Sequence, residues 1–212
     1  MIIAIDGSAA SGKGTLAKRL ATHLGLSHLD TGALYRAVGL QLLNAGQESK
    51  NIDENQCVNS CVELDTALTT SPLIRSEKVA EMASVLATMP AVRAALLDLQ
   101  RQFATTPPDP KGAILDGRDI GTVVLPHADF KFFIDADINT RAERRTKELL
   151  QAGQSVMFRD VLTDMQERNS RDRSRSAAPL RPADDAISID TSSMDADAVL
   201  ALALSHITPL SD

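Results

Sequence analysis

The residues with the clearest chemistry form one run near the start of the chain, Gly7-Ser8-Ala9-Ala10-Ser11-Gly12-Lys13-Gly14-Thr15. The spacing G-x-x-x-x-G-K is typical of a phosphate-binding loop, in which glycines let backbone N–H groups approach an anion and a lysine adds a full charge. The residue directly after Lys13 is Gly14, and the hydroxyl follows one position later, at Thr15. The spacing alone therefore assigns no magnesium ligand. The alternative interpretation is a glycine turn between a strand and a helix, with Lys13 as a surface charge.

Two further groups of polar residues follow predicted strands. Thr31 and Arg36 lie at a strand end and helix start, where a hydroxyl and a guanidinium suit a second phosphate site. A helix cap and a solvated charge explain them equally well. Asp116, Arg118 and Asp119 directly follow another apolar run, and Asp116 is placed to hold the water shell of a magnesium ion. The alternative is a turn with an internal Asp–Arg pair.

The charge distribution indicates a concentrated site for a small anion. The net charge is −6, yet residues 141–181 contain ten Lys/Arg and six Asp/Glu, a local balance of +4. The chain has only five Phe, one Tyr and no Trp, too few for base stacking along a nucleic-acid polymer. We expect arginines of this segment to contact the anion, and residues 146–161 to form a mobile lid with Gly153 as its hinge.

Hydrophobic patterning predicts the fold class. Five short apolar runs alternate with helical periodicity, at residues 2–6, 26–29, 113–116, 131–135 and 186–190. This order predicts an α/β fold with a five-stranded parallel sheet covered by helices on both faces. Residues 1–212 are expected to form a single domain, with a mostly helical insertion over 47–111. Ligands in such sheets lie beyond the carboxyl ends of the strands, where the phosphate loop and Asp116 both fall.

Composition excludes several classes of protein. No apolar run approaches the length of a membrane span, and no secretory pattern precedes Ile2. Cys57 and Cys61 are predicted to be reduced thiols, since two cysteines give no disulfide framework. We expect a cytoplasmic monomer that contacts neither a membrane nor a nucleic-acid polymer.

Two facing anion sites suit phosphoryl transfer between two phosphates, which depends mainly on positioning and charge neutralisation. No histidine falls inside the motifs, and an ionised phosphate acceptor needs no strong general base. Four segments, at 7–15, 30–36 (D-T-G-A-L-Y-R), 116–124 (D-G-R-D-I-G-T-V-V) and 168–175 (R-N-S-R-D-R-S-R), give the chain a close resemblance to the bacterial cytidylate kinases. The resemblance implies a nucleoside monophosphate kinase fold that transfers the γ-phosphoryl of ATP to CMP or dCMP with Mg²⁺.

The resemblance also implies roles for individual residues. ATP would be bound by the residues of the phosphate loop, Gly7, Ser8, Ala9, Ala10, Ser11, Gly12, Lys13, Gly14 and Thr15. The positions matching the family's CMP site are Thr31, Arg36, Ser84, Arg93, Arg118, Asp119, Arg168, Asp172 and Arg175. Lys13, Arg118 and Arg168 would act on the transferred group, and Thr15 and Asp116 would hold the metal, in part through water. In one departure from the longer family members, residues 47–75 lack the strand-turn-strand pattern of an inserted sheet.

Three rival functions have distinguishable signatures. Another small-acceptor kinase, for UMP, AMP or a metabolite, would share the donor site and differ at Ser84, Arg93 and Asp119. A phosphate-loop GTPase would carry an N-K-x-D guanine motif, which the sequence lacks. A nucleotide-sensing module without catalysis fits the arginine-rich segment poorly.

Overall fold

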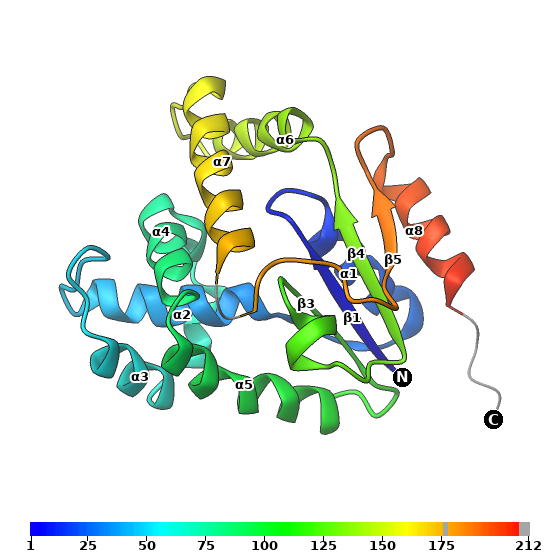
Figure 1. The fold of residues 1–212 in the computed structure, drawn as a ribbon, viewed down its shortest axis with the longest axis horizontal. Coiled ribbons are helices and arrows are strands. Elements are labelled where there is room, and N and C mark those ends of the chain that lie inside the picture. The colour runs from blue at the N-terminus through cyan, green and yellow to red at the C-terminus, as the bar shows by residue number, and fades with distance from the viewer. Residues whose placement is uncertain (176–177, 208–212) are drawn as a thin grey trace. The chain divides into compact units, whose positions relative to one another are not determined.

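The computed structural model describes residues 1–175 and 178–207, so positions 176 and 177 of the basic segment lie outside it. The chain packs as two compact units, residues 30–105 and the remainder of the chain on either side of them. Figure 1 labels the helices and strands in chain order.

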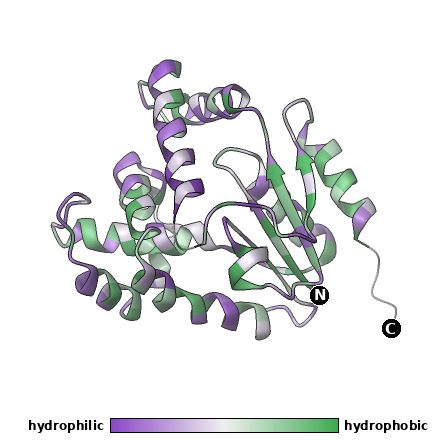
Figure 2. Cartoon of the chain, in the orientation of Figure 1, coloured by the Kyte–Doolittle hydropathy of each residue, from purple (hydrophilic) through white to green (hydrophobic). Residues whose placement is uncertain are grey.

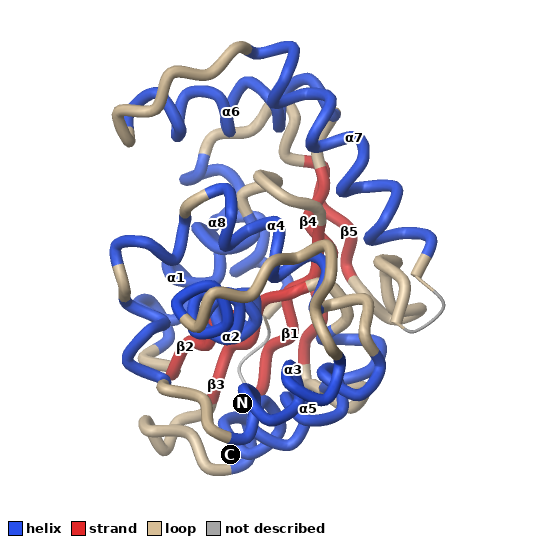
Figure 3. Tube along the Cα trace, turned by 90° about the vertical axis from the view of Figure 1, so that its left-hand side faces the viewer, coloured by secondary structure: helices blue, strands red, loops and turns tan. Residues whose placement is uncertain are grey.

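The larger unit is built on a five-stranded parallel sheet flanked by helices, which confirms the predicted fold class. The strands lie in the order β2-β3-β1-β4-β5 (red in Figure 3). Their bounds are β1 Ile2–Gly7, β2 Ser27–Asp30, β3 Ala113–Gly117, β4 Phe130–Asp135 and β5 Ile187–Asp190. In the middle of the sheet Ile5 pairs with Asp116 on one side and with Phe132 on the other. The carboxyl ends of β1 and β3 therefore reach the same edge.

Helices α1 (Lys13–Leu24) and α8 (Ala196–His206) pack against this sheet. Alternate β1 residues Ile3 and Ile5 are fully buried with Leu20 of α1, in a core that also includes Phe132 and Val199. In Figure 2 the strands are mostly hydrophobic along their length, as expected for a parallel sheet that is covered on both faces. The core thus fixes the strand after which the phosphate loop begins.

Helices α6 (Ile138–Gln151) and α7 (Phe158–Ser174) form a hairpin. Gly153 follows α6 with φ of 77°, a left-handed conformation that suits glycine at a helix end. The hairpin has a small core of its own, and Ala9 and Ala10 of the phosphate loop pack against it. The predicted lid, residues 146–161, spans the tip of this hairpin.

The second unit is helical. Its helices are α2 Thr31–Asn44, α3 Glu54–Val62, α4 Glu77–Leu86 and α5 Pro90–Thr105, with 3-10 turns at Thr66–Thr70 and Pro72–Arg75. Residues 47–75 contain no strand. The residue that caps α2 is Asp30, and not Thr31 as the alternative interpretation expects. The Asp30 side chain accepts a hydrogen bond from the Ala33 N–H, and Thr31 is the first residue of the helix.

Both thiols of α3 are buried and reduced. In the described parts of the chain no single helix is long and apolar enough to cross a membrane, although the bent pair α4 and α5 together passes that test by length and composition.

Gly7 ends β1 where a side chain has no space. A Cβ atom at this position would lie 2.0 Å from the carbonyl oxygen of Ile134 on β4, with φ of 155°. We predict that Gly7→Ala lowers the free energy of unfolding by about 3 kcal/mol or more, because backbone must move to relieve the overlap. Urea unfolding measures this. Gly153→Ala is the control, since its Cβ would meet nothing within 4 Å, and it should cost about 1–2 kcal/mol for the left-handed backbone alone. Equal losses would contradict the steric argument.

Candidate active site

The loop between β1 and α1 adopts a conformation that turns backbone amides toward one side. Ala10 and Gly12 have φ values of 57° and 92°, both left-handed, and α1 begins at Lys13 without a side-chain cap. Successive residues of alternating hand form a concave nest of N–H groups that binds anions. The positive end of the α1 dipole lies at the same point.

Two residues from distant elements hold the carbonyl groups of this loop. Arg141 of α6 donates from Nη1 to the Ala9 oxygen at 3.3 Å, and the Thr191 hydroxyl donates to the Ser11 oxygen at 2.8 Å. In a trans peptide the C=O and the following N–H point in opposite directions. The N–H groups of Ala10 and Gly12 therefore point away from Arg141 and Thr191, as anion binding requires.

The side chains of the loop also suit an anion. The Lys13 ammonium donates to the Ser8 carbonyl at 3.4 Å, so the lysine lies along the loop. The hydroxyls of Ser8 and Ser11 are buried and have no hydrogen-bond partner among the described residues. A buried hydroxyl without a partner is costly. Phosphate oxygens seated in the loop would supply acceptors for such groups.

Asp116 ends β3 beside the phosphate loop and is almost fully buried. One carboxylate oxygen, Oδ1, lies 2.7 Å from Nε2 of His28 on β2, while Oδ2 lies 3.6 Å from the position of a Cβ at Gly14. Thr15 is exposed in the first turn of α1. Among the described residues, no group of three or more His, Cys, Asp or Glu side chains is arranged so that it could hold a metal ion. The Oδ2 oxygen of Asp116 and the hydroxyl of Thr15 are ligand types that fit Mg²⁺, which keeps several waters and binds mainly through nucleotide phosphates.

A second polar cluster joins the loop after β3 to α7. The guanidinium of Arg118 donates from Nε to Oδ2 of Asp172 at 2.8 Å, and Arg175 lies 3.7 Å from the other oxygen. Arg168 precedes Asp172 by one helical turn, on the same face of α7. The arrangement brings four of the predicted acceptor residues together, three guanidinium groups around one buried carboxylate.

The charge of this cluster controls the ionisation of Asp172. Burial alone would raise the pKa of the Asp172 carboxyl, but the guanidinium groups of Arg118, Arg168 and Arg175 outweigh burial and hold that pKa below its usual value. The carboxylate therefore stays charged at neutral pH and keeps the arginines from repelling one another.

Asp119, the fifth acceptor residue of this unit, is buried just before a π-helical turn, Ile120–Val124. Its carbonyl oxygen accepts from the N–H groups of Val123 and Val124, at 2.9 and 3.1 Å. Asp6, at the end of β1, accepts from the N–H groups of Ile120 and Gly121, each at 2.7 Å. The backbone that directly follows Asp119 is thus fixed.

The remaining predicted acceptor residues belong to the helical unit. Thr31 is buried at the start of α2, and Arg36, one turn later, lies 3.7 Å from the Asp30 carboxylate. Ser84 of α4 is buried, and its hydroxyl has no hydrogen-bond partner among the described residues. Arg93 of α5 is half-buried and donates to the Ala87 carbonyl at 3.4 Å. The buried hydroxyl of Ser84 is suited to a polar ligand.

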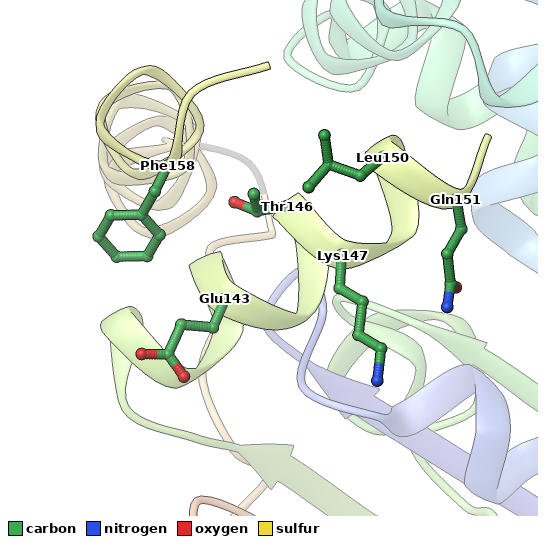
Figure 4. A pocket seen from close by; sticks show the side chains of 6 residues that line it. All are labelled: Glu143, Thr146, Lys147, Leu150, Gln151 and Phe158. Atoms are coloured by element: carbon green, nitrogen blue, oxygen red, sulfur yellow. The ribbon is translucent and has the colours of Figure 1, made fainter. Parts of the chain in front are cut away.

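One cavity of about 440 Å³ lies on the α6–α7 hairpin. Its lining residues are Glu143, Thr146, Lys147, Leu150, Gln151 and Phe158, and Figure 4 shows Phe158 of α7 near the side chains of α6. Leu150 and Phe158 are partly exposed there. Apart from Glu143, its lining residues belong to the predicted lid, and none is a predicted site residue.

Comparison with known proteins decides the family. The family model described as "Cytidylate kinase" matches residues 3–209. The chain belongs to the cytidylate kinase family. The resemblance drawn from the four motifs is confirmed, and the chain is a nucleoside monophosphate kinase. The cytidylate kinase of Paramagnetospirillum magneticum is 52% identical over 206 residues, 97% of each chain. That of Xanthobacter autotrophicus is 51% identical over 207 residues, 98% of this chain and 97% of the other.

Solved structures show the same fold at low sequence identity. A protein of unknown character from Eubacterium ventriosum aligns with a TM-score of 0.55 at 16% identity, covering 99% of each chain. A protein of Thermus thermophilus aligns with a TM-score of 0.50 at 17% identity, covering 98% of each chain. These likenesses bear on the fold alone.

Four residues that hold the candidate site in place have no positioning role that the sequence alone indicates. Asp6, His28 and Thr191 carry no motif of their own, and Arg141 was grouped with the arginines expected at the anion. Arg141 is instead buried, bound to the Ala136 and Ala9 carbonyls and to Asn169. The one signal in the sequence was Asp6, a carboxylate at the end of an otherwise apolar strand.

The Arg118–Asp172 contact predicts a pH dependence of stability. Because the folded pKa of Asp172 lies below the ordinary 3.8, its contribution is complete above about pH 4 and is lost as pH falls through the lower folded pKa. We predict that Asp172→Asn lowers the free energy of unfolding by about 3 kcal/mol at pH 7 and by less as pH falls below about 4.

Urea unfolding between pH 3 and 8 checks this. Asp164→Asn, at an exposed carboxylate on the same helix, is the control and should change stability little at any pH. A gap between wild type and Asp172→Asn that stays constant to pH 3 would contradict the prediction.

Proposed function

We propose that this enzyme transfers the γ-phosphoryl of ATP in line to CMP or dCMP, giving ADP and CDP or dCDP. Family membership over nearly the whole chain supports the reaction class. The observation that carries the acceptor site is the buried group of Arg118, Arg168 and Arg175 around Asp172. Three guanidinium groups around one carboxylate keep a net positive charge, which suits a phosphate monoester.

The donor phosphates would bind in the loop of residues 7–15. Its amides of Ala10 and Gly12 face away from the anchored carbonyls, and Lys13 is flexible enough to move from the Ser8 carbonyl to the outer phosphates. Phosphoryl transfer passes through a loose transition state, so these donors act by positioning and by charge neutralisation. Arg118 and Arg168 would extend this neutralisation to the transferred group.

Magnesium would be held by the nucleotide phosphates, with Thr15 and Asp116 contributing ligands in part through water. Bound there, it would neutralise the developing charge on the phosphates. His28 fixes the Asp116 carboxylate by occupying Oδ1, so that Oδ2 remains on the side of Gly14. Residues 146–161 would close over the donor and exclude water.

The base would be selected by Asp119 together with Ser84, Arg93 and Arg175. A buried carboxylate such as Asp119 accepts from the 4-amino group of cytosine, whereas arginine N–H groups donate to O2 and N3. Uracil presents a carbonyl to Asp119, and an unpaired buried acceptor is strongly disfavoured. CMP and dCMP differ at the ribose, near which Asp172 would lie.

An acceptor panel tests the proposal. ADP release with ATP as donor should be fast with CMP and dCMP and at least about 100-fold lower, as kcat/KM, with UMP, AMP and GMP. Lys13→Ala is the control, because it removes the lysine of the donor site, and it should be inactive with all five acceptors. Comparable use of UMP or AMP would replace the cytidine assignment with the rival small-acceptor kinase.

Asp119→Ala tests whether Asp119 recognises the base. This variant should lower kcat/KM for CMP by about 100-fold, while that for UMP changes by less than about fivefold, because only cytosine loses a hydrogen bond. Steady-state kinetics with both acceptors measures the ratio. A CMP-to-UMP ratio equal to that of the wild type would remove Asp119 from this role.

A further inference from the structure

Among the described residues of the phosphate-loop region, Asp6 is the buried carboxylate that neither the donor site nor the acceptor site uses. It is the residue before Gly7, it is 3% exposed, and its two oxygens accept separately from the N–H groups of Ile120 and Gly121 at 2.7 Å. These hydrogen bonds join positions 114 and 115 residues apart in the sequence. A single side chain thus connects the start of the donor loop to the turn after Asp119.

The turn has little freedom once these bonds form. The Asp119 carbonyl accepts from the N–H groups of Val123 and Val124, and Asp6 binds the two amides directly after Asp119. Gly121 lets the turn approach, because a Cβ there would lie 3.4 Å from Oδ2 of Asp6 and 3.2 Å from Cδ of Lys131. The backbone that carries Asp119 is therefore held in part by the Asp6 carboxylate.

We propose that Asp6 is a positioning residue for substrate selection: through the Ile120 and Gly121 amides it holds Asp119 and Arg118 in the orientation that binds the acceptor nucleotide. The inference rests on the proposed function of those two residues. In this role Asp6 acts by holding the two backbone amides and not by contact with the substrate.

The surroundings of Asp6 make the link sensitive to pH. Burial raises the pKa of Asp6 to about 7, with the nearby Asp119 carboxylate also raising it, while the two amide bonds and Arg118 lower it. From β4, the stem of Lys131 packs on Gly121, and its ammonium is bound to the Asp185 carboxylate and the Pro126 carbonyl. When Asp6 is protonated, one oxygen carries a hydrogen and one of the two amide bonds weakens.

Asp6→Asn is the direct test, because asparagine has the same shape but one acceptor oxygen, and its NH₂ group faces the second amide. We expect KM for CMP to rise about tenfold, the CMP-to-UMP ratio of kcat/KM to fall, and KM for ATP to stay within about twofold. The Asn-to-wild-type ratio of KM for CMP should be largest at pH 8 and approach one at pH 6, where the wild-type carboxyl is mostly protonated. Ionisation of CMP itself cancels in this ratio.

Two further variants separate positioning from a general loss of structure. Asp129→Asn is a matched control, since Asp129 accepts from the Ile2 N–H at 2.7 Å at the opposite end of the same strand, and both KM values should stay within about twofold. Gly121→Ala disturbs the same contact from the other side. It should raise KM for CMP a few-fold and leave KM for ATP unchanged.

A readout without substrate keeps the inference separate from the proposed function. In NMR spectra of the wild type, the amide signals of Ile120 and Gly121 should titrate near pH 7, and in Asp6→Asn they should not. If the wild type ignores CMP, the proposed function fails while this titration still tests the link. Amide signals that do not titrate, an unchanged KM for CMP in Asp6→Asn, or a parallel rise in KM for ATP would overturn the inference.

Discussion

The central position of β1 in the parallel sheet is the constraint on which the larger unit depends. Because β1 pairs with β3 on one side and β4 on the other, its carboxyl end lies between theirs. Gly7 can leave the sheet there only without a side chain, since the Ile134 carbonyl occupies the space of a Cβ. The phosphate loop, Asp116 and the turn after Asp119 all begin within a few residues of this edge. The position of the candidate site thus depends on close backbone packing at Gly7.

Much of the fold follows from local sequence patterns. The five apolar runs and the helical periodicity between them predict the strands to within one or two residues, because burial on both faces selects continuous apolar segments. The phosphate loop was also predictable, since its glycines and lysine are adjacent in the sequence. Position after a strand indicated Arg118 and Asp119 as members of an anion site, whereas the individual roles of Arg118, Asp119, Arg168 and Arg175 came from the resemblance to a family.

The positioning residues could not be found in this way. Asp6 acts on amides more than a hundred residues away, Thr191 binds the Ser11 carbonyl across 180 positions, and His28 meets Asp116 across 88. Each contact is a side chain bound to a group whose direction depends on tertiary packing, and a backbone carbonyl or amide leaves no trace in residue types. The same reasoning explains Arg141. Its charge indicated anion binding, but burial beside the Ala136 and Ala9 carbonyls gives it neutral acceptors within the protein.

The arginines of the scaffold, Arg141 and Arg144, differ from those of the acceptor site, Arg118 and Arg175, in the groups that accept their hydrogen bonds. Arg141 binds the Ala9 carbonyl of the phosphate loop and lies 3.7 Å from the Asp135 carboxylate, while Arg144 binds the carbonyl of Thr191, so both arginines serve the scaffold around the loop. Arg118 and Arg175 surround Asp172, a single negative charge among three positive ones. A cluster with one carboxylate is ordered before substrate arrives, because Asp172 offsets much of the repulsion. It still carries enough positive charge to attract a phosphate monoester, whose two negative charges at neutral pH would complete the neutralisation. Removing Asp172 would make the cluster more positive but less ordered, so a strong acceptor site needs this carboxylate as well as its arginines.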